Sequence, residues 1–368
     1  MPLVLAPRGD NNRFSQDSFV FEMLAYGFSV LKKGKHGYDF IGEEPDFVVS
    51  HNPDDLDDSL FLRKFRNVPS VVHLHYQLQY YTDWHSLELS LSNTRAAIVP
   101  TQFLAKQVAA RFPDLKCHVV SNGVRKHLFN PSNELERARF KQQIGLGKAT
   151  KLVGYVGRLT QAKGLDILEM ICKQIAKMQV ALVIQFPFWH NSADLSECQR
   201  SLSVAQRLKE LAPKNVILYP DKSPRLAPRP VRFLDALLMP SLSEVQPMVV
   251  LEALASGVPV IGTRATPFFD ELSGSKEMDG SCQFVDLPSR FRVGDSKLDR
   301  LHLQELHGIV LRLVELLEHI SSPSDAQRIS MAGNLPAKYF DAEMYRKWTG
   351  VYSEHHQSRA PGINESLA

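Results

Sequence analysis

Short apolar runs recur along the chain, and the longer segments between them space their apolar residues at helical intervals. The short runs suit buried parallel strands, and the longer segments suit helices. In the first part of the chain we predict strands at 3–6, 47–50, 70–74, 97–100 and 117–120, with helices at 15–32, 57–65, 84–93 and 102–111. The second part repeats the alternation, with strands at 151–157, 180–186, 216–219, 236–239 and 258–262, and helices at 164–178, 201–211, 248–256, 303–319 and 344–355. This alternation favours an α/β protein with two doubly wound parallel sheets.

A turn sequence, Ser121-Asn122-Gly123, separates the two parts of the pattern. The chain has 368 residues, which favours two domains over one. We therefore predict an N-terminal domain at 1–124, a linker at 125–150 and a C-terminal domain at 151–340, followed by a last helix at 341–358. The linker itself contains a segment, 134–144, with a helical pattern.

Composition and charge narrow the class of protein. The formal net charge of +3 is too small for a typical nucleic-acid binder, so we expect no nucleic-acid partner. The four cysteines show no metal-ligand spacing and fit reduced thiols of a cytoplasmic protein. The first apolar run is too short for a signal peptide, and no run reaches the ~18–20 residues of a membrane span. The sequence predicts a cytoplasmic protein, either free or peripheral at the inner face of a membrane.

One loop in the second half combines two cations with a helix start. The predicted strand ends at Gly157, Arg158 and Lys163 lie in the loop, and Gly164 opens a helix. Ligands of open α/β sheets bind at the carboxyl ends of strands, and a helix N-terminus favours an anion. A diphosphate fits this chemistry, because arginine binds phosphate through a planar fork and lysine through a point charge. The alternative is a pair of surface charges around an ordinary β–α turn.

A second loop and helix carry two carboxylates. Glu244 lies in a loop before a helix, Pro247 suits the first helical position, and Glu252 lies beyond the first turn. Gly257 is a natural helix stop. A carboxylate accepts hydrogen bonds from sugar or ribose hydroxyls, as a nucleotide-sugar site requires. The alternative is an interaction of Glu244 with the helix dipole and a solvated or core-edge position for Glu252.

These segments, taken in order, resemble glycosyltransferase family 4, a retaining family of group 1 glycosyltransferases with the GT-B fold. The resemblance rests on the Gly157–Gly164 loop, on the Glu244 and Glu252 pair, and on Asn122-Gly-Val. It implies two Rossmann-like domains facing each other across a cleft, with the last helix crossing back to the N-terminal domain. The co-substrate would be a nucleoside-diphosphate sugar, a UDP- or GDP-sugar, with no further cofactor.

The resemblance also implies roles for individual residues. Arg158 and Lys163 would stabilise the departing diphosphate, Glu244 would contact the donor sugar, and Glu252 would hold the ribose. Gly157 would lie in the same donor loop.

Further residues follow from positions that match or depart from the family pattern. Pro247 stands where the family has glycine, which leaves the N–H groups of Met248 and Val249 to face the donor. His75 would face the sugar from the first domain, with His73 as its competitor. Gly9 matches the loop after the first strand, although the family's paired glycines are reduced to one.

The implied reaction needs no metal. Asp55-Leu56-Asp57 is an Asp-x-Asp sequence, which holds a divalent cation in another glycosyltransferase fold, but helix capping and solvation explain it here. We therefore predict transfer of a sugar, with retention, to a hydroxyl of a saccharide, a lipid-linked glycan or a small natural product. Two alternatives are a nucleotide-sugar epimerase or hydrolase, and a GT-B module that binds nucleotide without catalysis.

Overall fold

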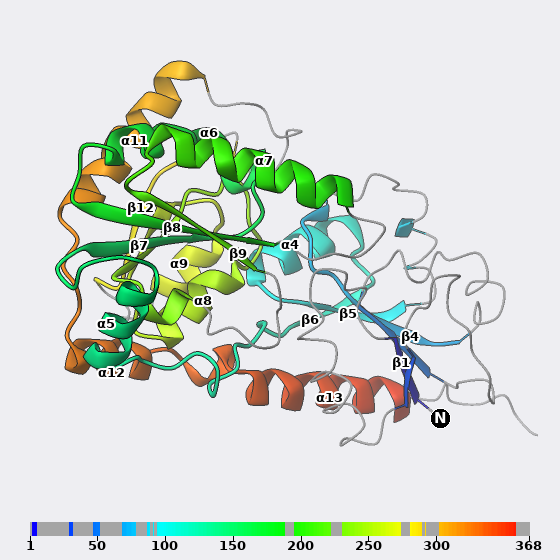
Figure 1. The fold of residues 1–368 in the computed structure, drawn as a ribbon. Coiled ribbons are helices and arrows are strands. Elements are labelled where there is room, and N and C mark those ends of the chain that lie inside the picture. Colours follow the sequence, from blue (N-terminus) through cyan, green and yellow to red (C-terminus); the bar gives the residue numbers. More distant parts are fainter. Residues whose placement is uncertain are drawn as a thin grey trace, which may run out of the picture. The chain divides into compact units, whose positions relative to one another are not determined.

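A computed structural model describes residues 2–5, 29–31, 47–51, 68–78, 87–88, 91, 94–187, 195–221, 230–273, 280–288, 291 and 302–357. The chain divides into two compact units, and Figure 1 colours them along the sequence. Unit 1 comprises Met1–Ser121 and Ala342–Ala368, and unit 2 comprises Asn122–Asp341.

The described strands of unit 1 form a six-stranded parallel sheet in the order β2-β1-β3-β4-β5-β6. The strands are β1 (Pro2–Leu5), β2 (Ser29–Leu31), β3 (Phe47–Ser50), β4 (Ser70–His73), β5 (Thr94–Val99) and β6 (Lys116–Val119). Helix α4 (Gln102–Arg111) connects β5 to β6, and the Thr101 hydroxyl caps it by accepting a hydrogen bond from the N–H of Leu104. The continuous apolar runs of β3 and β4 are buried throughout, as central parallel strands require.

The helix predicted at 15–32 is wrong at its carboxyl end, where Ser29–Leu31 forms β2. These three residues pair in parallel with residues 3–5 of β1. A three-residue run is too short to show the period of a strand, so pairing with β1 decides its structure.

Unit 2 contains a second six-stranded parallel sheet, in the order β12-β11-β10-β7-β8-β9. Its strands are β7 (Lys151–Val156), β8 (Val180–Pro187), β9 (Val216–Asp221), β10 (Ala236–Met239), β11 (Val260–Thr263) and β12 (Cys282–Val285). The described helices are α5 (Glu134–Gln143), α6 (Leu165–Ile175), α7 (Leu195–Leu211), α8 (Met248–Ala255), α9 (Phe268–Ser273), α11 (Leu303–Glu318) and α12 (Asp325–Gly333). Strand β12 and helices α9 and α12 were not predicted.

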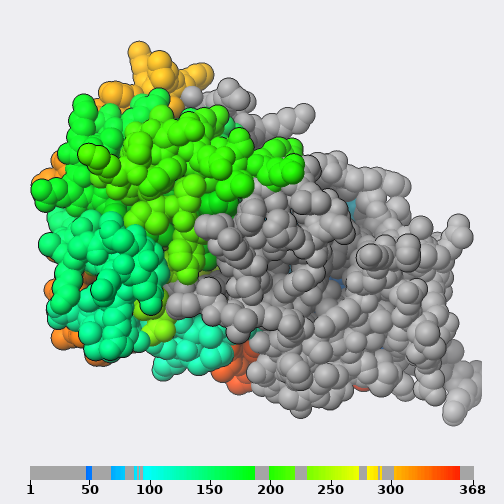
Figure 2. All heavy atoms as spheres, viewed as in Figure 1, coloured from blue at the N-terminus to red at the C-terminus, as the bar shows by residue number. Residues whose placement is uncertain are grey.

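Helices cover both faces of the unit 2 sheet, and alternate strand residues divide between two cores. Leu182 and Ile184 of β8 pack in one core with residues of α6, α7 and α11, whereas Ala181 and Val183 pack in the other with residues of α5, α8 and α9. In Figure 2, α6 and α7 form much of the visible surface of unit 2. The predicted architecture of two doubly wound parallel sheets is confirmed.

The last helix, α13 (Asp341–Gln357), packs on the sheet of unit 1. Met344, Trp348 and Tyr352 share a core cluster with Phe47 of β3 and Val71 of β4. Residues from the end of the chain therefore complete the core of the N-terminal sheet.

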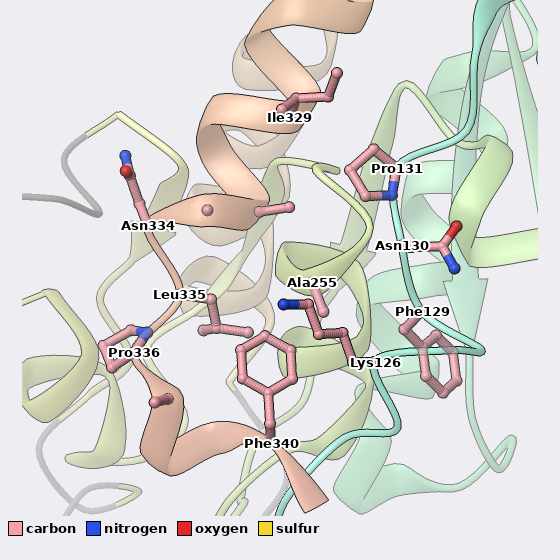
Figure 3. Close-up of a pocket in the computed structure, with 13 residues that line it drawn as sticks. Lys126, Phe129, Asn130, Pro131, Ala255, Ile329, Asn334, Leu335, Pro336 and Phe340 are labelled. Atoms are coloured by element: carbon pink, nitrogen blue, oxygen red, sulfur yellow. The ribbon is translucent and has the colours of Figure 1, made fainter.

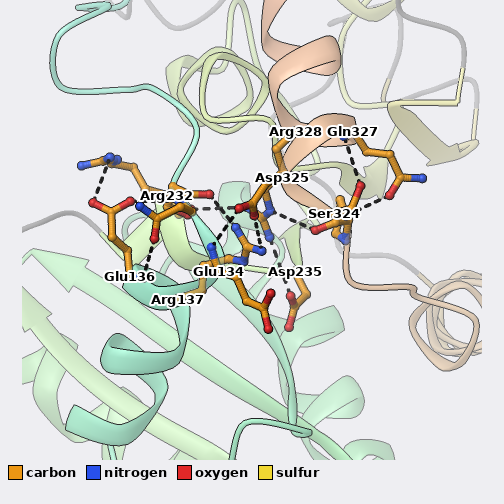
Figure 4. A network of polar contacts seen from close by, with 12 residues as sticks. Glu134, Glu136, Arg137, Arg232, Asp235, Ser324, Asp325, Gln327 and Arg328 are labelled. Atoms are coloured by element: carbon orange, nitrogen blue, oxygen red, sulfur yellow. Dashed lines mark hydrogen bonds and ion pairs between the residues drawn. The ribbon is translucent and has the colours of Figure 1, made fainter.

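A buried charged network connects α5, β10 and α12 within unit 2 (Figure 4). Asp235 Oδ2 accepts hydrogen bonds from Lys141 Nζ at 2.9 Å and from the N–H of Leu152 at 2.8 Å. The fully buried Arg328 lies 3.7 Å from Asp235 Oδ1 and donates to the carbonyl oxygen of Leu234 at 2.6 Å. Burial lowers the pKa of the Arg328 guanidinium to about 10, which still leaves it charged at neutral pH. The network ties α5 and α12 to the start of β10.

Candidate functional site

The loop after β7 begins the candidate site. Lys163 is the last residue of a 3₁₀ turn, Gln161–Lys163, which leads directly into α6. Gly164 joins the two elements with a φ of 75°, and a Cβ there would lie 1.9 Å from the carbonyl oxygen of Pro240. Glycine at 164 therefore allows the loop after β7 to lie against the segment after β10.

Arg158 lies in the same loop and is exposed. A hydrogen bond fixes its backbone, because the Tyr155 hydroxyl donates to the Arg158 carbonyl oxygen at 2.6 Å. Burial raises the pKa of Tyr155, and the Glu244 carboxylate raises it further, so the hydroxyl stays protonated. No ion pair of the Arg158 guanidinium is found among the described residues. The guanidinium is thus presented to solvent on a fixed backbone.

The loop after β10 holds Glu244 through its backbone. The N–H of Glu244 donates to the carbonyl oxygen of Ala265 at 3.2 Å, and the Thr266 hydroxyl donates to that of Val245 at 3.0 Å. The N–H of Leu242 donates to the carbonyl oxygen of Ala162 at 2.9 Å, which links this loop to the loop after β7.

The two loops bring Lys163 and Glu244 together. Lys163 Nζ lies 2.6 Å from Glu244 Oε1, and the Ser241 hydroxyl donates to the same oxygen at 2.8 Å. The Lys163 side chain is 25% exposed and that of Glu244 is 10% exposed. An anion reaching this pair from solvent can share the Lys163 ammonium, while Glu244 keeps its hydrogen bond from Ser241.

The topology of the sheet explains why these loops meet. Strand β7 is followed along the chain by β8 on one side, whereas β10 lies on its other side. The strands after β7 are therefore added to the sheet first on one side of β7 and then, from β10 on, on its other side. Such a reversal leaves a crevice at the carboxyl ends of the two strands, where open α/β sheets bind ligands.

Helix α8 follows the Glu244 loop. Pro247 occupies its N-cap, one residue before the first helical position predicted for it, and Met248 and Val249 are the first two helical residues. The first N–H groups of a helix have no acceptor within the helix, so those of Met248 and Val249 are available to a ligand. Glu252 lies in the second turn and is 9% exposed.

In unit 1, His75 lies beside two further histidines. His51 follows β3, His73 ends β4, and the rings of His51 and His73 stack at 3.9 Å between centroids. His73 is buried, with its Nε2 2.6 Å from the Tyr352 hydroxyl of α13, whereas His75 is only half-buried. Burial lowers the pKa of His75 to about 4 and those of His51 and His73 well below their usual range. The cluster is therefore neutral at pH 7.

His73 and His75, the two candidates for a ligand contact, differ in their exposure to solvent. His73 is buried and hydrogen-bonded to Tyr352 of α13, whereas His75 is the more exposed residue. Sequence reasoning missed His51, although its position directly after the apolar run of β3 is the same strand-end position that drew attention to His75. Gly9, Asp55 and Asp57 lie outside the described residues.

A separate cavity of about 800 Å³ lies elsewhere in unit 2 (Figure 3). Lys126 and Phe129 line one side, and Leu335 and Phe340 line the other. The ammonium of Lys126 lies 5.6 Å from the centre of the Phe340 ring. None of the predicted site residues lines this cavity, so it is distinct from the loops after β7 and β10.

The sequence of unit 2 matches a known family. Residues 136–283 match the family model of glycosyl transferases group 1. The match confirms the resemblance to group 1 glycosyltransferases for this segment, which contains Arg158, Lys163, Glu244 and Glu252. Assignment to family 4 in particular stays a prediction.

Three curated proteins illustrate what the chain is similar to. The chain is 28% identical over 149 residues to a D-inositol 3-phosphate glycosyltransferase of Segniliparus rotundus, covering 40% of this chain and 32% of the relative. It is 36% identical over 133 residues to a glycogen synthase of Geotalea daltonii, covering 35% and 26%. It is 25% identical over 229 residues to a lipopolysaccharide 1,2-N-acetylglucosaminetransferase of Salmonella typhimurium, covering 60% and 55%. The chain thus matches about a quarter to a half of the length of these relatives.

Solved structures share the fold over nearly the whole chain. HepE of Anabaena, solved in complex with UDP and glucose, has a TM-score of 0.65 at 15% identity and covers 96% of this chain and 100% of its own. Sucrose-phosphate synthase from Thermosynechococcus elongatus has a TM-score of 0.66 at 15% identity, covering 96% and 98%.

Among the described residues, no helix combines the length and apolar character needed to cross a bilayer.

Proposed function

We propose that the protein is a glycosyltransferase that moves a sugar from a nucleoside-diphosphate sugar to an acceptor hydroxyl with retention of anomeric configuration. The observation that carries this proposal is the Lys163–Glu244 pair, which joins the loops that follow β7 and β10. The pair lies inside the segment that matches group 1 glycosyltransferases.

The cations of the β7 loop would stabilise the leaving diphosphate. Lys163 lies two residues before the first residue of α6, whose N-terminus carries a partial positive charge that favours an anion. Arg158 adds an exposed guanidinium that can bind two phosphate oxygens at once. Charge that develops as the diphosphate departs would then be met by donors already in place, which lowers the barrier.

The carboxylates would bind the donor's hydroxyl groups. Glu244 is held by Ser241 and Lys163, and it would accept a hydrogen bond from a sugar hydroxyl while it orients Lys163. Glu252, in the second turn of α8, would hold the ribose. The N–H groups of Met248 and Val249 would donate to the donor from the start of α8.

His75 would contribute from unit 1 as a neutral imidazole. Its lowered pKa excludes the imidazolium at pH 7, so it would donate or accept a single hydrogen bond to a sugar hydroxyl instead of supplying a charge. The departing diphosphate would itself accept the proton of the acceptor hydroxyl. Gly9 would lie in the loop that approaches the diphosphate or the acceptor.

UDP-sugars are the first donors to test, because several HepE structures were solved with UDP or UDP-glucose. GDP-sugars are the second. The acceptor would be a saccharide, a lipid-linked glycan or a small natural product. The reaction would take place in the cytoplasm or at the inner face of a membrane, and it needs no nucleic acid.

The test is turnover of a panel of UDP-, GDP-, ADP- and CMP-sugars, each with and without acceptors. We expect slow nucleotide release from one donor alone and faster release with the right acceptor, because an acceptor hydroxyl then replaces water at the attack position. The product's anomeric configuration, read by NMR, should match that of the donor. An inverted product contradicts retention. Rapid formation of a new nucleotide-sugar without acceptor favours the epimerase, and tight nucleotide binding without turnover favours the binding module.

A further inference from the structure

Two histidines and a carboxylate meet where α13 passes the edge strand of the unit 1 sheet. His118 lies on β6, the last strand of that sheet, and Glu354 and His355 lie near the end of α13. Their metal-ligating atoms all lie within 4.8 Å of one another. None of the three belongs to the donor site proposed above.

We propose that His118, Glu354 and His355 form a binding site for a late first-row divalent cation, Zn²⁺, Ni²⁺ or Cu²⁺. Imidazole suits these ions, and a carboxylate oxygen completes a ligand set that zinc sites use.

The distances fit one shared ion. The Nε2 atoms of His118 and His355 lie 3.0 Å apart, and Glu354 Oε1 lies 3.9 Å from His355 Nε2. Two nitrogens bound to one ion at about 2.05 Å lie about 2.9 Å apart at a right angle and about 3.3 Å apart in a tetrahedron. The observed separation of the imidazole nitrogens falls between these values. Only the carboxylate must move closer.

The ring orientations also fit. The two rings meet at 79° with centroids 5.2 Å apart, so their Nε2 atoms approach each other while the ring bodies stay apart. The cluster of His51, His73 and His75 is different, because its rings stack within 22° of parallel. The lone pairs of parallel stacked rings lie in parallel planes and do not converge on one point. His73 Nε2 also contacts Tyr352.

The two imidazoles hydrogen-bond to each other through their Nε2 atoms, so one of these nitrogens carries the shared proton. A bound ion replaces this proton, because the lone pair of each Nε2 must then face the ion.

Lys116 competes with a cation for the carboxylate of Glu354. Its Nζ lies 2.5 Å from Glu354 Oε1, and both side chains are half exposed, at 55% and 50%. An exposed lysine of this kind loses little free energy when it swings into solvent. Removing its charge should therefore strengthen metal binding, which distinguishes a metal site from a simple ion-pair cluster.

The bound ion would connect β6 to α13. His355 is already fixed on the helix side, because Arg95 donates to its carbonyl oxygen at 2.6 Å. A metal that binds the folded state but not the unfolded state raises the free energy of unfolding as its concentration rises. The site would thus stabilise the packing of α13 on the unit 1 sheet.

The experiment titrates the tag-free full chain with ZnCl₂ and NiCl₂, by calorimetry and by thermal unfolding. We expect one tight site per chain and a melting temperature that rises with metal concentration. The substitutions H118Q and H355Q should each weaken binding at least tenfold, whereas K116Q should tighten it severalfold. H319Q, which removes an exposed histidine of unit 2, is the matched control and should bind as the wild type does.

Several outcomes would overturn the proposal. They are wild-type affinity in both H118Q and H355Q, weaker binding in K116Q, or loss of the tight site in H51Q. His355 is buried, so each variant's unfolding is first measured in EDTA. If H355Q is unstable there, the half-buried His118 and the exposed Lys116 still decide the question.

Discussion

Lys163 and Glu244 lie 81 positions apart in the sequence, and their side chains form an ion pair of 2.6 Å between Nζ and Oε1. The pair joins the loop after β7 to the loop after β10, which also share a hydrogen bond from Leu242 to Ala162. In the absence of an anion, Glu244 therefore keeps the Lys163 ammonium in one position. A site held ready in this way is what electrostatic stabilisation of a leaving group requires.

Removing the charge of Lys163 should slow transfer without unfolding the protein. We expect Lys163→Ala to lower kcat/KM by ~10²-fold or more, the scale of losing one preorganised charge-stabilising donor. Steady-state kinetics with the donor found by the panel measure the effect. Lys173→Ala, an exposed lysine on α6, is the matched control and should retain activity. Near-normal rates in both Lys163→Ala and Arg158→Ala would refute the diphosphate assignment.

Transfer should persist without divalent metal, because Lys163 and Arg158 supply the positive charge. We expect the rate in excess EDTA to stay within about twofold of the rate in Mg²⁺, since no step at the diphosphate uses an ion. The measurement is initial velocity across a chelator series. If activity vanished and returned with Mg²⁺ or Mn²⁺, Asp55 and Asp57 would become candidate ligands.

Asp235 should be among the most sensitive positions for stability. Its carboxylate is almost fully buried and balances two buried cations, Lys141 and Arg328. Asp235→Asn leaves those charges without a counterion, so we expect a loss of about 3–5 kcal/mol in the free energy of unfolding. Urea denaturation measures it. Arg346→Ala removes an exposed ion pair with Glu343 and should leave the unfolding midpoint nearly unchanged.

The histidine cluster should make unit 1 sensitive to acid. The folded pKa of His75 is about 4, and those of His51 and His73 are also lowered, against about 6.5 in the unfolded chain. The unfolded state therefore binds more protons below pH 6.5. Stability is complete above that pH and falls as the pH drops towards 4, by up to ~1.4 kcal/mol per pH unit for each histidine.

Urea denaturation at pH 7.5, 6.0 and 5.0 tests this pH dependence. The groups that face the cluster from α13 are Tyr352, which stays protonated throughout this range, and the indole of Trp348. His75→Gln removes one titrating group and should flatten the slope. An unchanged slope in this variant, or greater stability at pH 5.0 than at pH 7.5, would contradict the assignment.

The alternation of strands and helices could be predicted where burial dictates the residue type. The predicted strand at 236–239 agrees with β10, because all four of its residues are buried and apolar. The helix at 102–111 agrees with α4, which has a threonine cap at its start. Strand β2 and strand β12 were missed, because short edge strands depend on pairing with a neighbour.

In the candidate site, too, the local sequence predicted the residues, whereas the contacts between distant residues could not be predicted. The sequence predicted loops after strands for both Lys163 and Glu244. The distance between these two residues depends on β7 and β10 being neighbours in the sheet, which the local sequence of either strand does not determine. His73 and His75 could not be separated, since the contact of His73 with Tyr352 spans 279 positions. His118 and His355 likewise meet only in the folded protein.

The packing of α13 on the N-terminal sheet has a consequence for synthesis on the ribosome. Met344, Trp348 and Tyr352 complete the core around Phe47 and Val71, yet they lie 273 to 305 positions later in the sequence. Unit 2 is a continuous segment and can fold as soon as it emerges, whereas the sheet of unit 1 lacks these apolar partners until α13 has been synthesised. We therefore expect unit 2 to complete its core before unit 1 does, although most of unit 1 is synthesised first.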